Sequence, residues 1–241
     1  CEMLGGDIQQ ALIPAAALEM IHTYSLIHDD LPGMDNDDYR RGRLTNHKVF
    51  GEGFAILAGD GLLNYAYECI LKNALDYGAN LEGHILAARE IAQRAGVGGM
   101  VAGQSIDLLS EHREPNEATL HYIHMHKTAD LLTAPLLAAA YIAGADEKSI
   151  AALRTFGACV GLAFQIDDDL LDVMGDAKDL GKQTGMDEQR GKMTWPSLVG
   201  VEAAQKKSRE LWTQAEEALA VFGDSAWFLR EFAEALAKRK K

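Results

Sequence analysis

Apolar residues recur at helical spacing along most of this chain, while the alternating pattern of a half-buried strand is almost absent. A chain of this kind buries its apolar stripes by packing helix against helix, so the pattern predicts an all-α fold, a large helical bundle. The predicted helices are Gln9–His28, Gly51–Asn73, Leu81–Ser110, Asn116–Ile142, Glu147–Met174, Pro196–Val221 and Ser225–Lys238.

The sequence predicts one domain over residues 1–241. Gly and Pro are scattered singly, and neither a linker composition nor a fixed-period repeat is present. The chain opens at Cys1, without a methionine and inside an apparent element. From this we expect that the domain lacks one or more N-terminal helices.

The charge balance limits the classes of partner. The formal net charge of −13 argues against a nucleic-acid or anionic-membrane partner, although bound metal ions would still permit an anionic substrate. Cys1, Cys69 and Cys159 form no CxxC pair, which fits a reducing cytoplasm. The longest strongly apolar run, Leu131–Ala145, is too short for a spanning helix and contains Pro135, so we expect no membrane insertion.

A first acidic cluster interrupts the helical pattern at Asp29, Asp30 and Asp35. Pro32-Gly33 lies within the cluster and should end the preceding helix, because proline and glycine both disfavour its continuation. Asp29 is therefore predicted on the last helical turn and Asp35 on the turning chain.

A second cluster, at Asp167–Asp169 and Asp172, lies inside an apolar helix. Asp168 and Asp172 are four residues apart and share a face, where like charges repel. Each cluster taken singly is also explained by solvated surface charge. The apolar flanks of the second cluster favour burial instead, and buried carboxylates need compensating cations.

Hard cations such as Mg²⁺ bind carboxylate and phosphate oxygens. Two facing acidic clusters would therefore hold a diphosphate through bridging metal ions. Cationic residues that could bind the phosphates directly follow both clusters, at Arg40, Arg41, Lys127 (next to Thr128), Lys182 and Lys192.

These motifs, in this order, resemble the trans-prenyl diphosphate synthase family, in particular its bacterial farnesyl diphosphate synthase type. The resemblance covers essentially the whole chain and implies the isoprenoid synthase fold, with a central cavity between helices and a homodimer. The motifs are Asp29-Asp30-x4-Asp35 with Arg40-Arg41-Gly42, Gly103-Gln104-x2-Asp107, Lys127-Thr128, Phe164-Gln165-x2-Asp168-Asp169-x2-Asp172 and Gly181-Lys182.

The resemblance also implies residue roles. Asp29 and Asp35 would hold two Mg²⁺ ions with Asp30 in support, Asp168 would hold a third, and Asp169 and Asp172 would act through metal-bound water. Isopentenyl diphosphate would contact His22 and Arg41, whereas the allylic diphosphate would contact Arg40, Lys127, Thr128, Gln165 and Lys182, with Lys192 close by. The family's basic Gly-Gly-Lys-Arg-x-Arg-Pro-like segment, which also holds isopentenyl diphosphate, is absent from this sequence.

The implied reaction is magnesium-assisted ionisation, condensation and elimination, which joins isopentenyl diphosphate to dimethylallyl or geranyl diphosphate. Asp29, Asp35, Asp168, Lys127 and Lys182 would be its catalytic residues. Farnesyl diphosphate is the expected product and geranylgeranyl diphosphate the alternative. Tyr24, with Ser25 beside it, is the predicted limit on chain length, although an ordinary core aromatic would look the same.

Other classes of protein fit less well. A class I terpene cyclase has a different second metal motif, and a regulatory subunit of a heteromeric synthase often lacks one aspartate cluster. A di-iron bundle needs Glu-x-x-His pairs, which adjacent Glu111-His112 does not supply. His121, His124 and His126 are explained as a solvated helix face rather than a metal site, and His28 is a candidate hydrogen-bond partner of Asp29.

Overall fold

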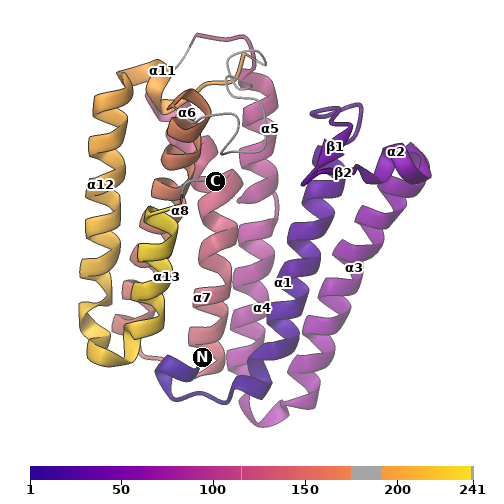
Figure 1. Cartoon of the computed structure of the whole chain (residues 1–241). Helices are drawn as coiled ribbons and strands as arrows, with labels where there is room; N and C mark the ends of the chain where they lie inside the picture. The colour runs from indigo at the N-terminus through magenta and orange to yellow at the C-terminus, as the bar shows by residue number, and fades with distance from the viewer. Residues whose placement is uncertain (115, 175–190, 240–241) are drawn as a thin grey trace.

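The computed structural model describes residues 1–114, 116–174 and 191–239 (Figure 1). Within these ranges the chain is a bundle of long helices with one short hairpin, so the predicted all-α class is confirmed. Its elements are η1 (Glu2–Leu4), α1 (Ile8–Asp29), β1 (Tyr39–Arg40), β2 (Arg43–Leu44), α2 (Asn46–Phe50), α3 (Glu52–Asp76), η2 (Gly78–Asn80), α4 (Leu81–Ala95), α5 (Met100–Ser110), α6 (Glu117–Ile123), η3 (His124–Ala129), α7 (Asp130–Ile142), α8 (Glu147–Met174), α11 (Trp195–Val199), α12 (Val201–Ala218), η4 (Leu219–Ala226) and α13 (Trp227–Ala237).

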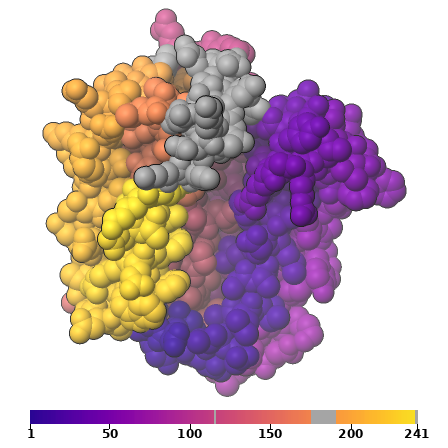
Figure 2. Space-filling model, viewed as in Figure 1, coloured from indigo at the N-terminus to yellow at the C-terminus, as the bar shows by residue number. Residues whose placement is uncertain are grey.

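The long helices pack as neighbouring pairs, α1 on α3, α4 on α7, α7 on α8 and α8 on α12 (Figure 1). One core cluster lies among α1, α3, α4 and α7 and includes the fully buried Ile21 and Ile91. A second lies among α8, α12 and α13 and includes Phe156 and Leu219. The N-terminal segment meets the C-terminal helices on one face of the molecule (Figure 2).

Three predicted helices are interrupted in the structure. Leu81–Ser110 divides into α4 and α5 because a glycine-rich turn separates them, and a β-carbon at Gly99 would collide with Arg94 O. Pro196–Val221 divides at Gly200, whose φ of 84° is a left-handed conformation that suits glycine. Asn116–Ile142 is also three segments, α6, η3 and α7, and η3 is a π-helix.

One helix in the described part of the chain is long and apolar enough to cross a membrane. This is α8, Glu147–Met174, and 56% of its most apolar window is buried within the bundle. Core helices of globular proteins have the same length and composition, so the burial of α8 accounts for its apolar character.

A hollow of about 620 Å³ lies between α8, α12 and the C-terminal residues. Its lining includes Asp167, Leu171, Ser208, Trp212 and Arg239. The hollow is on the α12 side of α8.

Candidate active site

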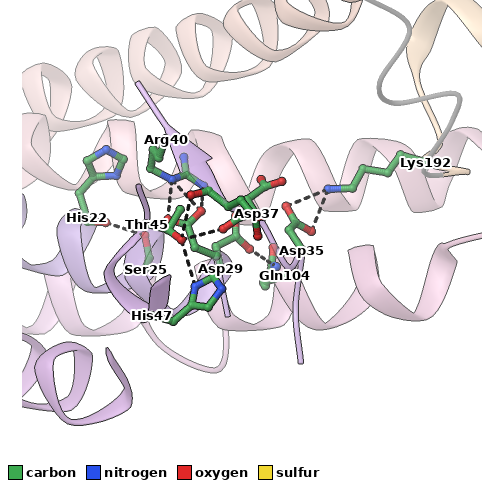
Figure 3. Close-up of polar contacts among 12 residues, drawn as sticks. His22, Ser25, Asp29, Asp35, Asp37, Arg40, Thr45, His47, Gln104 and Lys192 are labelled. Carbon is green, nitrogen blue, oxygen red and sulfur yellow. Dashed lines mark hydrogen bonds and ion pairs between the residues drawn. The ribbon is translucent and has the colours of Figure 1, made fainter. Parts of the chain in front are cut away.

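The first acidic cluster lies where α1 ends. The helix terminates at Asp29, as Pro32-Gly33 predicts, and the chain turns back so that Asp35 N donates to Asp29 O at 2.9 Å. The turn is closed by Thr45, a buried residue whose hydroxyl donates to Asp37 O at 2.7 Å (Figure 3). Backbone and side-chain hydrogen bonds thus hold the carboxylates of Asp29 and Asp35 at one end of the bundle.

Asp29 lies in an environment that disfavours its charged form. Burial raises the pKa of its carboxyl, although Lys127 nearby opposes the rise and Asp35 adds to it. Gln104, on α5, donates to Asp29 Oδ1 at 2.5 Å (Figure 3). A carboxylate with a raised pKa gains free energy when a further cation approaches.

Asp107 joins two of the predicted phosphate-binding lysines. Lys127 Nζ lies 2.6 Å from Asp107 Oδ2, and Lys192 Nζ lies 3.8 Å from the same oxygen. Lys192 also donates to Asp35 at 3.3 Å (Figure 3). Burial by itself would lower the pKa of Lys192, but Asp107, Asp35 and Asp29 raise it above its ordinary value. The structure therefore gathers two ammonium groups and three carboxylates in one place.

Asp30 and Arg40 form a separate ion pair beside this group. Arg40 Nε donates to both carboxylate oxygens of Asp30, at 2.9 and 3.0 Å, and Asp30 is buried. Asp30 therefore orients Arg40, and its supporting role toward magnesium stays a prediction. Arg41 is exposed with a φ of 52°, and the pKa of His22 is lowered mainly by burial and in part by Arg41 and Arg40.

The carboxylates of the second acidic cluster contact different partners. Asp168 Oδ1 lies 3.4 Å from Arg239 Nη2, whose guanidinium stacks on the Phe164 ring at 3.6 Å. Asp167 turns away toward α12 and accepts hydrogen bonds from Ser208 and Trp212. The adjacent carboxylates therefore serve different neighbours.

Asp169 and Asp172 are both buried, 3% and 8% exposed. Asp169 accepts a hydrogen bond from the Trp195 backbone N–H at 2.9 Å, so it has a direct protein contact besides any role through water.

The π-helix η3 connects the two clusters. Lys127 reaches Asp107 on the first-cluster side, while Thr128, the next residue, donates to Gln165 Oε1 of the second-cluster helix at 2.9 Å. α5 approaches η3 so closely that a β-carbon on Gly103 would collide with Lys127 N. π-Turns inside α-helices are frequent at functional sites because they redirect side chains.

Tyr24 and Ser25 lie one to two turns below Asp29 on α1. Tyr24 is 7% exposed and belongs to the α1–α3–α4–α7 core, and its ring meets His28 edge-on. Burial raises the pKa of Tyr24, and burial and Tyr24 together raise that of Tyr67 on α3. Ser25 donates to His22 O at 2.8 Å (Figure 3).

The histidine predictions need correction. His121 is exposed, but His126 pairs with Asp130 at 2.7 Å and His124 is only 4% exposed, so the three do not form a solvated face. Burial lowers the pKa of His124 to about 3. His28 Nε2 lies 3.0 Å from Ile56 O, because its ring packs over Gly59, and this contact replaces the expected one with Asp29.

Within the described ranges, no three His, Cys, Asp or Glu side chains are close enough to hold a metal ion by themselves. The carboxylates of the first cluster supply only oxygen donors, which are the ligands Mg²⁺ prefers, and Mg²⁺ commonly takes its remaining ligands from phosphate and water. The donor set therefore fits magnesium bound together with a diphosphate. Lys182, with Gly181, lies outside the described residues.

Several site residues were not assigned from the sequence. Gln104 and Asp107 stood in a motif without a role, and His124, Trp195 and Arg239 carried no separate signal. For Gln104, Asp107 and His124, a polar side chain inside a helical stretch was the available sign. Their partners, Asp29, Lys127, Asp168 and Asp169, are remote in sequence, so spacing alone could not identify the contacts.

Comparison with known proteins places this geometry in a family. The chain is 46% identical over 230 residues to geranylgeranyl pyrophosphate synthase 9, chloroplastic, of Arabidopsis thaliana, covering 93% of this chain and 63% of that protein. It is 36% identical to an FPP/GFPP synthase from Zymomonas mobilis, with a TM-score of 0.87 over 98% of this chain and 79% of that one. A geranyltransferase from Helicobacter pylori, complexed with magnesium and isoprenyl diphosphate, is 34% identical, with a TM-score of 0.79 over 93% of this chain and 72% of that one.

The plastid relative is considerably longer than this chain, which spans less than two thirds of its length. The polyprenyl synthetase family model matches residues 1–221, which include both aspartate clusters, η3 and Lys192. The chain belongs to the polyprenyl synthetase family.

Proposed function

We propose that this chain is the catalytic domain of a magnesium-dependent short-chain prenyltransferase. Its substrates would be isopentenyl diphosphate and dimethylallyl or geranyl diphosphate, and its main product farnesyl diphosphate. The observation that carries the proposal is the group formed by Asp29, Asp35, Lys127 and Lys192 around Asp107. It supplies metal-binding oxygens and phosphate-binding ammonium groups together.

Magnesium fits this group on physical grounds. Asp29 has a raised pKa because of burial, and Asp29 and Asp35 repel each other, so a divalent cation between them would relieve an existing cost. Three ions are proposed, held by Asp29 and Asp35 on one wall and Asp168 on the other, with Asp30, Asp169 and Asp172 in supporting positions. When bound, they would neutralise the negative charge that develops on the leaving diphosphate.

The cations of the site are now paired with carboxylates, Lys127 with Asp107, Lys192 with Asp35 and Arg40 with Asp30. A diphosphate would compete for these cations, and its affinity would rise when Asp35 turns to a metal ion and releases Lys192. Lys127 and Arg40 would then stabilise the departing diphosphate, and the partial burial of the site strengthens such charge interactions. No side chain needs to act as a nucleophile, and diphosphate itself would accept the final proton.

Tyr24 supports a short product. It lies five residues before Asp29, about 7–8 Å further along the helix axis at 1.5 Å per residue. A tail that grows along α1 from the metal site would meet the buried Tyr24 ring at that depth. Geranylgeranyl diphosphate is the second candidate product, because the A. thaliana relative is named a geranylgeranyl pyrophosphate synthase. Chromatography of the dephosphorylated products of wild-type protein distinguishes C15 from C20.

We also propose that the protein is a cytoplasmic homodimer. The outer face of α3 carries exposed Phe54, Leu57, Leu71 and Leu75, 55–76% exposed, at the edge of the bundle (Figure 1). Large exposed apolar stripes of this kind are typical of protein–protein interfaces. The cysteines in the structure are free thiols, which is compatible with a reducing compartment.

Substitution of the metal-binding carboxylates tests the function. Asp29→Ala and Asp168→Ala should each lower kcat by about 10³-fold, because loss of a metal ligand removes several kcal/mol of transition-state stabilisation. Asp76→Ala is a matched control, since this surface carboxylate pairs only with Lys72 among the contacts described. Turnover of radiolabelled isopentenyl diphosphate measures the effect. Wild-type protein without magnesium-dependent turnover, or both variants at near-normal turnover, would refute the proposal.

A further inference from the structure

Five residues from three elements are linked in a ring of contacts next to the candidate site. Thr128 Oγ1 donates to Gln165 Oε1 at 2.9 Å, and Gln165 Nε2 donates to Asp169 Oδ1 at 3.3 Å. The backbone N–H of Trp195 donates to Asp169 Oδ2 at 2.9 Å, and the indole Nε1–H of Trp195 donates to His124 Nδ1 at 3.0 Å. His124 and Thr128 both belong to η3, so the path returns to its starting element.

The ring fixes the tautomer of His124. An indole N–H is only a donor, so Nδ1 must accept and the ring proton lies on Nε2. That nitrogen is 3.6 Å from Asp169 Oδ2, longer than a hydrogen bond but close enough for electrostatic attraction. His124, Asp169 and Trp195 are 4%, 3% and 4% exposed, so these contacts are shielded from water.

Three residues with roles in the proposed function lie next to the ring in the sequence. Lys127 is adjacent to Thr128, and Asp168 is adjacent to Asp169. Lys192 precedes Trp195 by three residues, at the start of the segment that leads into α11. The ring therefore ties η3, α8 and α11 together at the points from which these three side chains extend.

We propose that His124 and Trp195 are positioning residues that hold Asp169, and through it the second aspartate cluster, against η3 and Lys192. Asp169 then serves chiefly as the anchor of this ring, and Asp168 remains the carboxylate proposed to hold a metal ion on this wall. The inference rests on the proposed function, because it assigns these two residues to the metal site of that reaction.

The physical reason lies in burial. A buried carboxylate without donors is costly, so Asp169 stays where Trp195 N–H and Gln165 offer hydrogen bonds. Removing a partner that orients a metal-binding carboxylate typically lowers metal affinity about 10–100-fold, because the ligands lose their fixed geometry. The effect of losing His124 or Trp195 should therefore appear in magnesium affinity.

Trp195→Phe is the first test. It removes the indole donor but keeps an aromatic ring and the backbone N–H that binds Asp169. Trp227→Phe is the control, since Trp227 is 60% exposed on α13, where its ring meets Phe228, and it lies outside the ring of contacts. We expect Trp195→Phe to raise the half-saturating Mg²⁺ concentration roughly 10-fold or more, with a much smaller change in KM for isopentenyl diphosphate. Trp227→Phe should leave both values unchanged.

His124 supplies a second, conservative series. His124→Phe removes both nitrogens, whereas His124→Gln keeps an amide that can donate toward Asp169. We expect His124→Gln to recover much of the magnesium affinity that His124→Phe loses. A folded His124→Phe and a folded Trp195→Phe that both keep wild-type magnesium affinity would overturn the proposal. If either variant fails to fold, the magnesium affinity of His124→Gln and the wild-type measurement below decide between the outcomes.

A measurement that needs no turnover separates this inference from the proposed function. The chain has three tryptophans, so the ¹⁵N indole resonance of Trp195 can be assigned by its loss in Trp195→Phe. Addition of Mg²⁺ with inorganic pyrophosphate should shift this resonance more than that of the exposed Trp227, and calorimetry should show weaker pyrophosphate-dependent Mg²⁺ binding in Trp195→Phe. A Trp195 resonance that does not respond while Mg²⁺ and pyrophosphate bind would refute the inference. An enzyme that shows these shifts but makes no prenyl diphosphate would refute only the proposed function.

Discussion

Ion pairs with carboxylates hold the cationic residues of the candidate site in place. Lys127, Lys192 and Arg40 each have a carboxylate partner at 2.6–3.3 Å. Exposed pairs of this kind contribute little to stability, but these are partly buried and close together. Their arrangement keeps three cations ready for an anionic substrate while each is paired with a carboxylate.

Tyr24 gives a prediction at this scale. Tyr24→Ala should shift the main product from C15 to C20 or longer, because the aromatic ring no longer blocks a tail growing along α1. Chromatography of the dephosphorylated products measures the shift, and Tyr24→Phe, which keeps the ring, should retain the wild-type product. The truncation should also cost about 3 kcal/mol of stability, as is usual for a buried aromatic. An active Tyr24→Ala enzyme with an unchanged product would assign the limit to another residue, such as Met20.

His84 predicts how stability depends on pH. It is buried, accepts from Asn73 at Nδ1 and contacts Gln10 Oε1 through Nε2, and burial lowers its pKa below the ordinary value of 6.5. The unfolded chain therefore binds a proton at His84 at higher pH than the folded chain does. Stability from this residue is present above about pH 6.5 and falls as the pH drops, by up to about 1.4 kcal/mol per pH unit.

His84→Gln tests that dependence, since glutamine hydrogen-bonds without titrating. The difference in unfolding free energy between wild type and variant should change between pH 7.5 and 5 in urea titrations, with wild type losing more. His121→Gln, at an exposed histidine, is the control. Parallel pH curves for wild type and His84→Gln would exclude a role for His84 in acid sensitivity.

Among the secondary-structure elements, the π-helix η3 connects the two halves of the site, the first-cluster side and the second-cluster helix. Its last turn is held by Asp130, which binds both Arg94 Nη1 at 2.5 Å and His126 at 2.7 Å. Its opposite side accommodates α5 only because residue 103 has no β-carbon. The contact between α5 and η3 sets the positions of Gln104, Asp107 and Lys127.

Gly103→Ala should therefore separate α5 from η3. We expect a loss of about 1–3 kcal/mol in unfolding free energy, as for other overpacked sites, and a larger relative loss of kcat/KM because Asp107 and Lys127 move apart. Gly53→Ala on α3 is the matched control, since a β-carbon there meets nothing within 4 Å. Thermal unfolding and steady-state kinetics of both variants provide the comparison. Wild-type kinetics in a folded Gly103→Ala protein would contradict this account of η3.

For the whole molecule, the apolar face of α3 predicts self-association. A double variant, Phe54→Lys with Leu57→Lys, should convert a dimer to a monomer, because two lysines per subunit would lie in the contact. Light scattering coupled to size exclusion measures the mass. Phe228→Lys, at a 59% exposed aromatic on α13, is the comparison. If only Phe228→Lys abolishes the dimer, the interface lies on α13 and not on α3.

The sequence alone determined the class of fold and the ends of the two helices that carry the acidic clusters. Helical periodicity is a local property, and so are the breaks that Pro32-Gly33 imposes after Asp29 and the spacing of Asp168 from Asp172. Asp29, Asp35 and Lys127 were named from their motifs and Lys192 as a nearby cation, and the structure brings the four together. These features depend on residues only a few positions apart along the chain.

Only the tertiary structure determined which side chains are buried and which residues hydrogen-bond to each other. His124 was expected on a solvated face, yet it lies buried in a ring of contacts with Asp169 and Trp195. Gln104 reaches Asp29 from 75 residues away. A hydrogen bond forms only when the donor–acceptor distance is correct to within a few tenths of an ångström. The packing of whole helices fixes that distance, and local sequence does not encode it.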